Sequence, residues 1–288
     1  MAEGSAGRAP WFLSGPGLVL FAALLGAPLV MTFMLRFYQF DYSTGGIQPA
    51  FSFANYLEVI EDSCFHLIFG RTFGVALLVS VICVLIGAPE AYILNRMGNP
   101  WKSLFLVVII GPLLISVIVR TLGWALLFGS QDGISHALQW LGLVDEPVSL
   151  IFTTAGMVIA LVHVLVPFMV LTVWASLQRL DPQVEDAALT LGASQATVLR
   201  RIVLPQVMPG ILSGSLIVFS LTASAFATPA IIGGRRLKVV ATTAYDEYLS
   251  TLNWPLGAAI AILLLIATVI VIMSYNRLVE RRFAKVFE

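Results

Sequence analysis

The sequence contains six apolar runs, each long enough to cross the roughly 30 Å hydrocarbon core of a membrane as a helix. Of its 288 residues, 59% are hydrophobic and 11% are charged, whereas an average soluble domain has about 25% charged residues. Too few polar side chains remain to cover a water-soluble globule. A spanning β-barrel is excluded because its strands would alternate apolar and polar residues. We therefore predict an all-α membrane protein with six transmembrane helices, at about residues 11–36, 72–95, 103–128, 149–176, 206–231 and 255–276.

Lysine and arginine residues are divided unequally between the connections on the two sides of the membrane. With the N-terminus inside, ten of the 16 lie in cytoplasmic segments, five lie outside, and Arg120 lies within a run. The positive-inside rule then predicts that both termini are cytoplasmic. The first run is longer than a signal-peptide core of about 7–15 residues, so we expect it to be a retained span. We treat residues 1–288 as a single transmembrane domain.

Two segments on the outer side are expected to contain a short helix each. Residues 51–59 could begin a helix that lies on the membrane. Residues 133–143 carry apolar side chains at helical spacing and indicate a short amphipathic helix. Packing on the outer surface is the simpler role for both.

No pattern in the sequence predicts a catalytic site, a metal site or a nucleic-acid surface. The net charge is zero, which argues against a general surface for nucleic acid. None of the three lysines follows a glycine, so no phosphate-binding Gly-Lys loop is present. The two cysteines, Cys64 and Cys83, and the three histidines show no metal-binding spacing.

The longest cytoplasmic connection, residues 177–205, predicts two short helices separated by a glycine. Asp181 is a good N-cap, and Pro182 suits the first position of a helix. One apolar face then follows at helical spacing, and Gly192 ends this helix as a C′ glycine would. That face consists of Val184, Ala187, Ala188 and Leu191.

The second short helix begins after Ser194, a second N-cap, and carries Val198, Leu199 and Ile202 on one face. Pro205 is expected to interrupt the pattern and to open the next membrane span. We call residues 181–205 the elbow. Isolated helices shorter than about 12–15 residues are marginal in water, so the elbow needs a partner to pack on.

The residues of the elbow resemble the EAA signature of ABC-importer permeases. The match comprises Asp186, Ala187, Ala188, Gly192, Ile202, Leu204 and Pro205, with the family's glycine-to-isoleucine and isoleucine-to-Leu-Pro spacings. The resemblance implies that these residues form coupling helices, which dock in a groove of an ATPase subunit. Asp186 stands where the family usually has glutamate, and the neighbouring Glu185 is a second candidate for that role.

The resemblance extends over nearly the whole chain and is closest to the polyamine-type (spermidine/putrescine) permeases. Supporting stretches are Arg71-Thr72, Gly87-Ala88-Pro89, the run Arg120 to Trp124, Pro167-Phe168-Met169, Pro209-Gly210, Thr228-Pro229 and Gly233-Gly234. It implies a type I ABC-importer permease fold in a bacterial inner membrane. It further implies a second homologous permease, two ATPase subunits that bind ATP and magnesium, and a periplasmic binding protein. This chain itself would need no cofactor.

A few polar residues inside the spans are candidates for a substrate path. Buried charges are costly in lipid, which draws attention to Glu90 and Arg120. Glu90 could meet the partner permease, Arg96 or a substrate cation. Arg120 could snorkel outward, meet the outer Asp132 or face the path. His163, Ser224 and Thr228 complete the candidate set, although each also suits ordinary helix packing.

The substrate and two rival functions stay open at this stage. Polyamine is the first choice by resemblance, and an amino acid or amine derivative is the alternative, because the spans contain few acids. An ion-coupled secondary transporter would require buried acid chains and inverted repeats with broken helices, and neither is clear. A membrane scaffold would tolerate loss of the elbow without loss of solute uptake.

Overall fold

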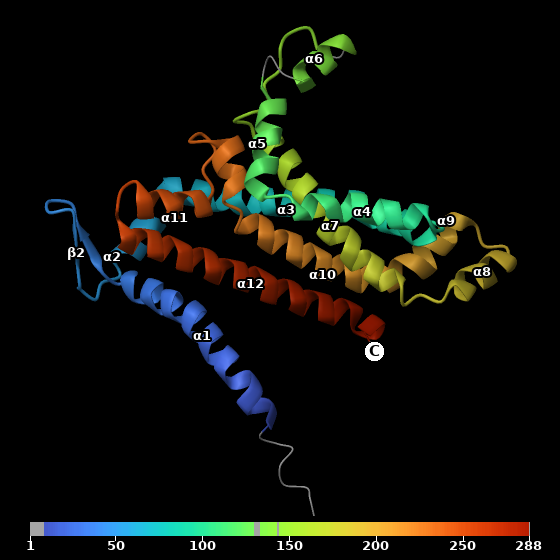
Figure 1. The fold of residues 1–288 in the computed structure, drawn as a ribbon, viewed down its shortest axis with the longest axis horizontal. Coiled ribbons are helices and arrows are strands. Elements are labelled where there is room, and N and C mark those ends of the chain that lie inside the picture. Colours follow the sequence, from blue (N-terminus) through green and yellow to red (C-terminus); the bar gives the residue numbers. More distant parts are fainter. Residues whose placement is uncertain (1–8, 130–132, 143, 288) are drawn as a thin grey trace, which may run out of the picture. The chain divides into compact units, whose positions relative to one another are not determined.

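The computed structural model describes residues 9–129, 133–142 and 144–287, which form a chain dominated by helices (Figure 1). The helices are α1 (Ala9–Leu35), α2 (Ala54–Glu61), α3 (Ser63–Arg96), α4 (Trp101–Leu114), α5 (Val117–Leu127), α6 (Gly133–Trp140), α7 (Thr154–Leu177), α8 (Pro182–Thr190), α9 (Gln195–Val198), α10 (Leu204–Ala223), α11 (Val240–Leu249) and α12 (Trp254–Phe287). Two π-helical turns, Leu199–Val203 and Pro229–Gly233, lie before and after α10. Among the described residues, the β-structure consists of a small antiparallel hairpin of β1 (Gln39–Asp41) and β2 (Gly46–Gln48). The sequence analysis did not predict this hairpin.

Within the described residues, five helical segments are long and apolar enough to cross a membrane, and a bent pair of helices makes a sixth. The five are Ser14–Leu35, Ser63–Arg96, Thr154–Leu177, Gln195–Ala223 and Trp254–Leu278. The predicted helical membrane protein is thereby confirmed. The second span begins at Ser63 rather than near residue 72, and the fifth helix ends at Ala223 rather than near residue 231.

The third predicted span is wrong as a continuous helix. α4 ends at Leu114, α5 begins at Val117, and the two helices are bent by 97°. Pro112 lies in the last turn of α4, where it has no N–H to donate to the carbonyl of Val108, so this turn of the helix is weakened. The backbone N–H of Ile115 still donates to the carbonyl of Pro112 at 3.3 Å, so the break keeps part of its hydrogen bonding.

The described chain divides into two compact units: residues 1–65 with 243–263, and residues 66–242 with 264–288. In the first unit, the buried Asn55 amide of α2 donates to the carbonyls of Arg36 and Tyr38, at 2.9 and 2.8 Å. These bonds satisfy backbone acceptors that follow the end of α1. The Asn253 amide also donates to the Tyr42 hydroxyl at 3.2 Å.

The hairpin loop is closed by the carboxylate of Asp41. It accepts hydrogen bonds from the Ser43 backbone N–H at 2.9 Å and from the Thr44 hydroxyl at 2.9 Å. The side-chain and backbone hydrogen bonds from Ser43 lower the pKa of Asp41 from 3.8 to about 2. Because the folded-state pKa is the lower one, this stabilisation is present above pH 3.8 and is lost as pH falls through about 2.

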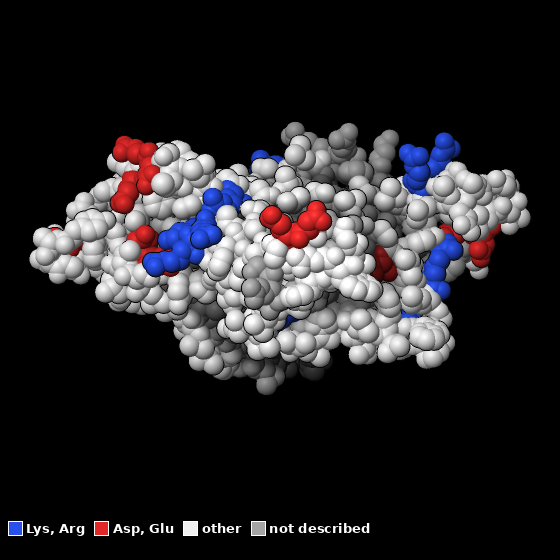
Figure 2. Space-filling view, turned by 90° about the horizontal axis from the view of Figure 1, so that it is seen from above, with Lys and Arg blue, Asp and Glu red and all other residues white. Residues whose placement is uncertain are grey.

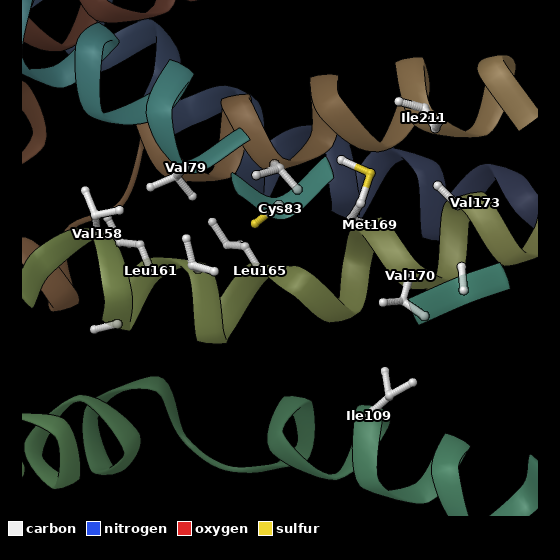
Figure 3. Close-up of a cluster of buried hydrophobic side chains, with 14 of the residues drawn as sticks. Val79, Cys83, Ile109, Val158, Leu161, Leu165, Met169, Val170, Val173 and Ile211 are labelled. Carbon is white, nitrogen blue, oxygen red and sulfur yellow. The ribbon is translucent and has the colours of Figure 1, made fainter. Parts of the chain in front are cut away.

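The core of the second unit forms where α3, α7 and α10 pack together. Figure 3 shows Val79 and Cys83 from α3 beside Leu161, Leu165 and Met169 from α7, and most of these side chains are fully buried. Outside the core, many large apolar side chains of the spans are exposed, as expected for surfaces that face lipid or another subunit. Figure 2 shows the same property: most of the visible face is uncharged, and charged atoms gather in a few clusters.

α7 and α10 approach closely because α10 carries glycines at the contact. A Cβ atom built on Gly210 would lie 2.7 Å from the backbone oxygen of Thr172 and 2.4 Å from the Ser176 hydroxyl. A Cβ on Gly214 would lie 2.4 Å from the Thr172 hydroxyl. Small residues of this kind allow close helix packing within a membrane.

We predict that Gly210→Ala destabilises the detergent-solubilised protein by about 1–3 kcal/mol, since a backbone atom cannot move aside without shifting a helix. The matched control is Gly74→Ala in α3, where a Cβ would have nothing within 4 Å. That variant should be neutral or slightly stabilised, because alanine favours a helix over glycine. Thermal unfolding of both variants measures the difference. Equal stability of the two would contradict the packing argument.

Candidate functional site

The elbow has the two-helix form that its caps predict. The Asp181 side chain accepts from the backbone N–H of Gln183 at 3.0 Å, at the start of α8. Gly192 follows that helix at φ +85°, a conformation that side chains with a Cβ rarely adopt. The Ser194 hydroxyl then accepts from the Thr197 backbone N–H at 3.3 Å and caps α9.

Pro205 lies in the first turn of α10 and so opens the next membrane helix, as expected, but the helix is not broken before it, contrary to the other half of the expectation. The helical segment runs from Gln195 to Ala223, with Pro205 in its interior. A π-helical turn at Leu199–Val203 comes immediately before it, and the Leu204 N–H donates to the carbonyl of Leu199, five residues back. The wider turn accommodates the proline ring and its missing N–H, so the chain enters α10 without a break.

Part of the apolar face of α8 is exposed. Val184 is 43% and Leu191 is 89% exposed, and Ala187 is exposed as well, whereas Ala188 packs against the core. An exposed leucine at the end of a two-turn helix gains nothing from this chain alone. Another surface is therefore required to cover these side chains.

The two adjacent acids of α8 have different environments. Asp186 is exposed, but Glu185 is 7% exposed and forms an ion pair with Arg96 at the end of α3. The Arg96 guanidinium also lies 4.8 Å from the ring centroid of Tyr92. Sequence analysis did not foresee this pair, because its partners are separated by 89 residues. Of the two candidates for a docking carboxylate, Asp186 is the one on the surface.

A second polar contact joins the end of α3 to the end of α7. The Gln178 amide, just after α7, donates to the Asn95 side-chain oxygen at 2.7 Å. Ile202 is half-buried and packs against the core, Leu204 is 44% exposed, and Pro205 is half-buried. The elbow is thus attached to the end of α3 by the Glu185–Arg96 ion pair, while its own packing is only partial.

Arg120 is bonded to the break between α4 and α5. Its guanidinium donates to the carbonyl of Pro112 near the end of α4, which also accepts from the Ile115 backbone N–H at 3.3 Å. A cation at this position also complements the negative end of the helix dipole. Asp132, the acid suggested as its partner, lies outside the described residues. Arg120 also lines a cavity of about 300 Å³ with Thr228.

The remaining candidates for the substrate path do not form one site. Thr228 is 2% exposed, and its hydroxyl lies 3.2 Å from that of Thr121. Ser224 follows the end of α10, and its hydroxyl donates to the Ser220 carbonyl at 2.9 Å. Since α10 ends before Ser224, these hydroxyls do not share one helical face. Glu90 and His163, by contrast, line the same cavity, of about 560 Å³.

With this geometry, the chain is a helical membrane protein whose partly exposed elbow lies between two membrane-spanning helices. Residues 6–285 match the family model described as "Binding-protein-dependent transport system inner membrane component". The chain therefore belongs to this family, the permeases of ABC importers, and is a transport protein rather than an enzyme.

Its relatives include the spermidine/putrescine transport system permease protein PotB of Escherichia coli (strain K12), 29% identical over 80% of this chain and 84% of PotB. The inner membrane ABC transporter permease protein YdcU of the same strain is 29% identical over 94% of this chain and 92% of YdcU. Among solved structures, a bacterial ABC transporter that imports the acidic polysaccharide alginate has a TM-score of 0.76 at 17% identity, covering 95% of this chain and 96% of that one.

We predict that Glu185→Gln loosens the elbow, because it leaves Arg96 without its counter-charge. Since the Arg96 side chain is 50% exposed, solvent reduces the loss to about 1–2 kcal/mol. The measurement is the rate of tryptic cleavage at Arg200 and Arg201 in the solubilised protein, which should rise several-fold. Asp186→Asn, the matched control on the exposed neighbour, should leave the rate unchanged. An equal response of both variants would refute a specific role for the ion pair.

Proposed function

We propose that this chain is the permease subunit of an ATP-driven importer in a bacterial inner membrane, and that its solute is a polyamine such as putrescine or spermidine. The observation that carries the importer mechanism is the exposed apolar face of α8, beside a helix that continues into a span. Such a face suits a coupling helix that transmits movement of an ATPase to the membrane helices. The name of PotB supports the polyamine assignment.

The assembly we propose contains a second, related permease, two ATPase subunits and a periplasmic binding protein. The alginate transporter offers a precedent, since it also has a structure in complex with an alginate pentasaccharide-bound periplasmic protein. ATP and magnesium would bind the ATPase subunits. Closure of those subunits would move α8, and the chain would alternate between two states that differ in their contacts.

Docking of the ATPase can be tested at the most exposed leucine of the elbow. We predict that Leu191→Glu lowers the amount of ATPase that co-purifies with the permease at least about tenfold, because a charge replaces a buried apolar contact. The protein should still fold, since Leu191 is 89% exposed in this chain. Leu141→Glu, at a leucine 61% exposed near α6, is the matched control and should co-purify normally.

A normal yield of ATPase with the Leu191 variant would contradict the proposed docking face. Reduced membrane insertion of that variant would show instead that the residue supports the fold. Both results are read from the same membrane preparation.

The substrate assignment is tested by uptake in proteoliposomes that contain the full assembly and its binding protein. We predict ATP-dependent uptake of radiolabelled putrescine or spermidine, and unlabelled amino acids should not compete.

An amino acid or amine derivative is the second candidate, because the described lining of the 560 Å³ cavity holds a single carboxylate, that of Glu90. Competition by such a compound, without polyamine uptake, would favour it. Uptake that follows an ion gradient without ATPase would refute the importer mechanism.

A further inference from the structure

The 560 Å³ cavity of the second unit is formed by α3, α4, α5 and α7. Its walls are mostly isoleucine and valine, among them Ile82, Val108 and Val162. Three side chains with polar groups join them: Glu90, Trp124 and His163. Apolar walls with a few convergent polar groups, in a volume between about 300 and 1,000 Å³, are typical of cavities that hold small molecules.

Glu90 has no counter-charge within the chain as described. No ion pair or hydrogen bond among the described residues involves its carboxyl group, and its half-buried side chain lies in an apolar span. Lipid offers neither a cation nor a donor, so a carboxylate at this position is costly unless another molecule approaches it. Arg96, which the sequence suggested as a partner, is paired with Glu185 instead.

The other two polar groups add no opposing charge. The Trp124 indole N–H donates to Nδ1 of His163 at 3.1 Å. Because the indole nitrogen only donates, Nδ1 must be the unprotonated acceptor, and the imidazole is neutral with its proton on Nε2. Arg120 is bonded to the Pro112 carbonyl and lines the neighbouring cavity. Glu90 is the one acidic residue among the described lining residues, and Trp124 adds an aromatic ring to the same lining.

We propose that this cavity binds the ammonium end of an aliphatic amine cation, with Glu90 as its counter-ion and the isoleucine and valine side chains against its methylene groups. The proposal deepens the polyamine import proposed above and rests on it for the biological substrate. A divalent metal ion fits poorly, because such ions need several oxygen ligands and the described lining supplies one carboxylate. The described residues also contain no group of three potential metal ligands.

The decisive experiment is labelling of Glu90 in the purified full assembly by dicyclohexylcarbodiimide, a hydrophobic reagent that reacts with carboxyl groups. Mass spectrometry of the peptide that contains Glu90 measures the rate of labelling. We expect millimolar putrescine to slow the reaction at least about tenfold, the effect of one charge-assisted hydrogen bond. The neutral 1,4-butanediol, which has the same chain length, should leave the rate unchanged.

A variant supplies a second measurement. Glu90→Gln should abolish this label, assemble normally, and lower putrescine uptake about tenfold at low concentration. Glu61→Gln, at an exposed acid of α2 outside the cavity, is the matched control and should transport normally. If Glu90→Gln fails to assemble, the labelling of the unaltered protein still decides the question.

Labelling that putrescine does not slow, or an absence of labelling without amine, would overturn the inference. If the assembly imports polyamine while Glu90 stays unprotected, this inference fails alone. If putrescine protects Glu90 but no polyamine is imported, the proposed substrate fails and the cation site stands.

Discussion

The hydrogen bonding of the backbone in an apolar surrounding constrains every part of this structure. Lipid offers no partner for a free N–H or carbonyl, so each irregular point within a span needs one from the protein. At the break between α4 and α5, the Pro112 carbonyl accepts both from the Ile115 N–H at 3.3 Å and from the Arg120 guanidinium. Before Pro205, a π-helical turn keeps the backbone bonded, through the Leu204 N–H and the Leu199 carbonyl. Both sites need hydrogen-bond partners for the backbone: the break between α4 and α5 uses a side chain, and the segment before Pro205 uses a π-helical turn.

The segment of α3 from Glu90 to Arg96 connects the two regions to which we assign function. Arg96 is paired with Glu185 of α8, and Glu90 lines the cavity between α3, α4, α5 and α7. Six residues of helix separate them, a rise of about 9 Å. A displacement of α8 by a docked ATPase would be transmitted through the ion pair to the helix that carries the carboxylate. The elbow and the proposed cation site would then belong to one rigid element.

Much of the fold could be predicted because it depends on local signals. The lengths of the apolar runs predicted the spans, and Asp181, Gly192 and Ser194 predicted the two elbow helices with their caps. Short helices predicted near residues 51–59 and 133–143 appear as α2 and α6. The prediction of a continuous third span failed at the break between α4 and α5, and the expected interruption before Pro205 is absent. Pro112 accompanies a break and Pro205 does not, since the outcome depends on which groups nearby can accept or donate a hydrogen bond.

The sequence by itself determined that the chain is helical, that it spans a membrane, and that an elbow with an EAA-like signature precedes the fifth helix, because these follow from hydrophobicity and spacing along the chain. Only the tertiary structure decided that Glu185 is turned inward and Asp186 outward, that Arg120 bonds a backbone carbonyl, and that Glu90 shares a cavity with Trp124 and His163. The ion pair of Glu185 and the shared cavity of Glu90 depend on side chains from helices that are distant in sequence, and the Arg120 bond depends on the bend between α4 and α5; no local pattern specifies which groups meet.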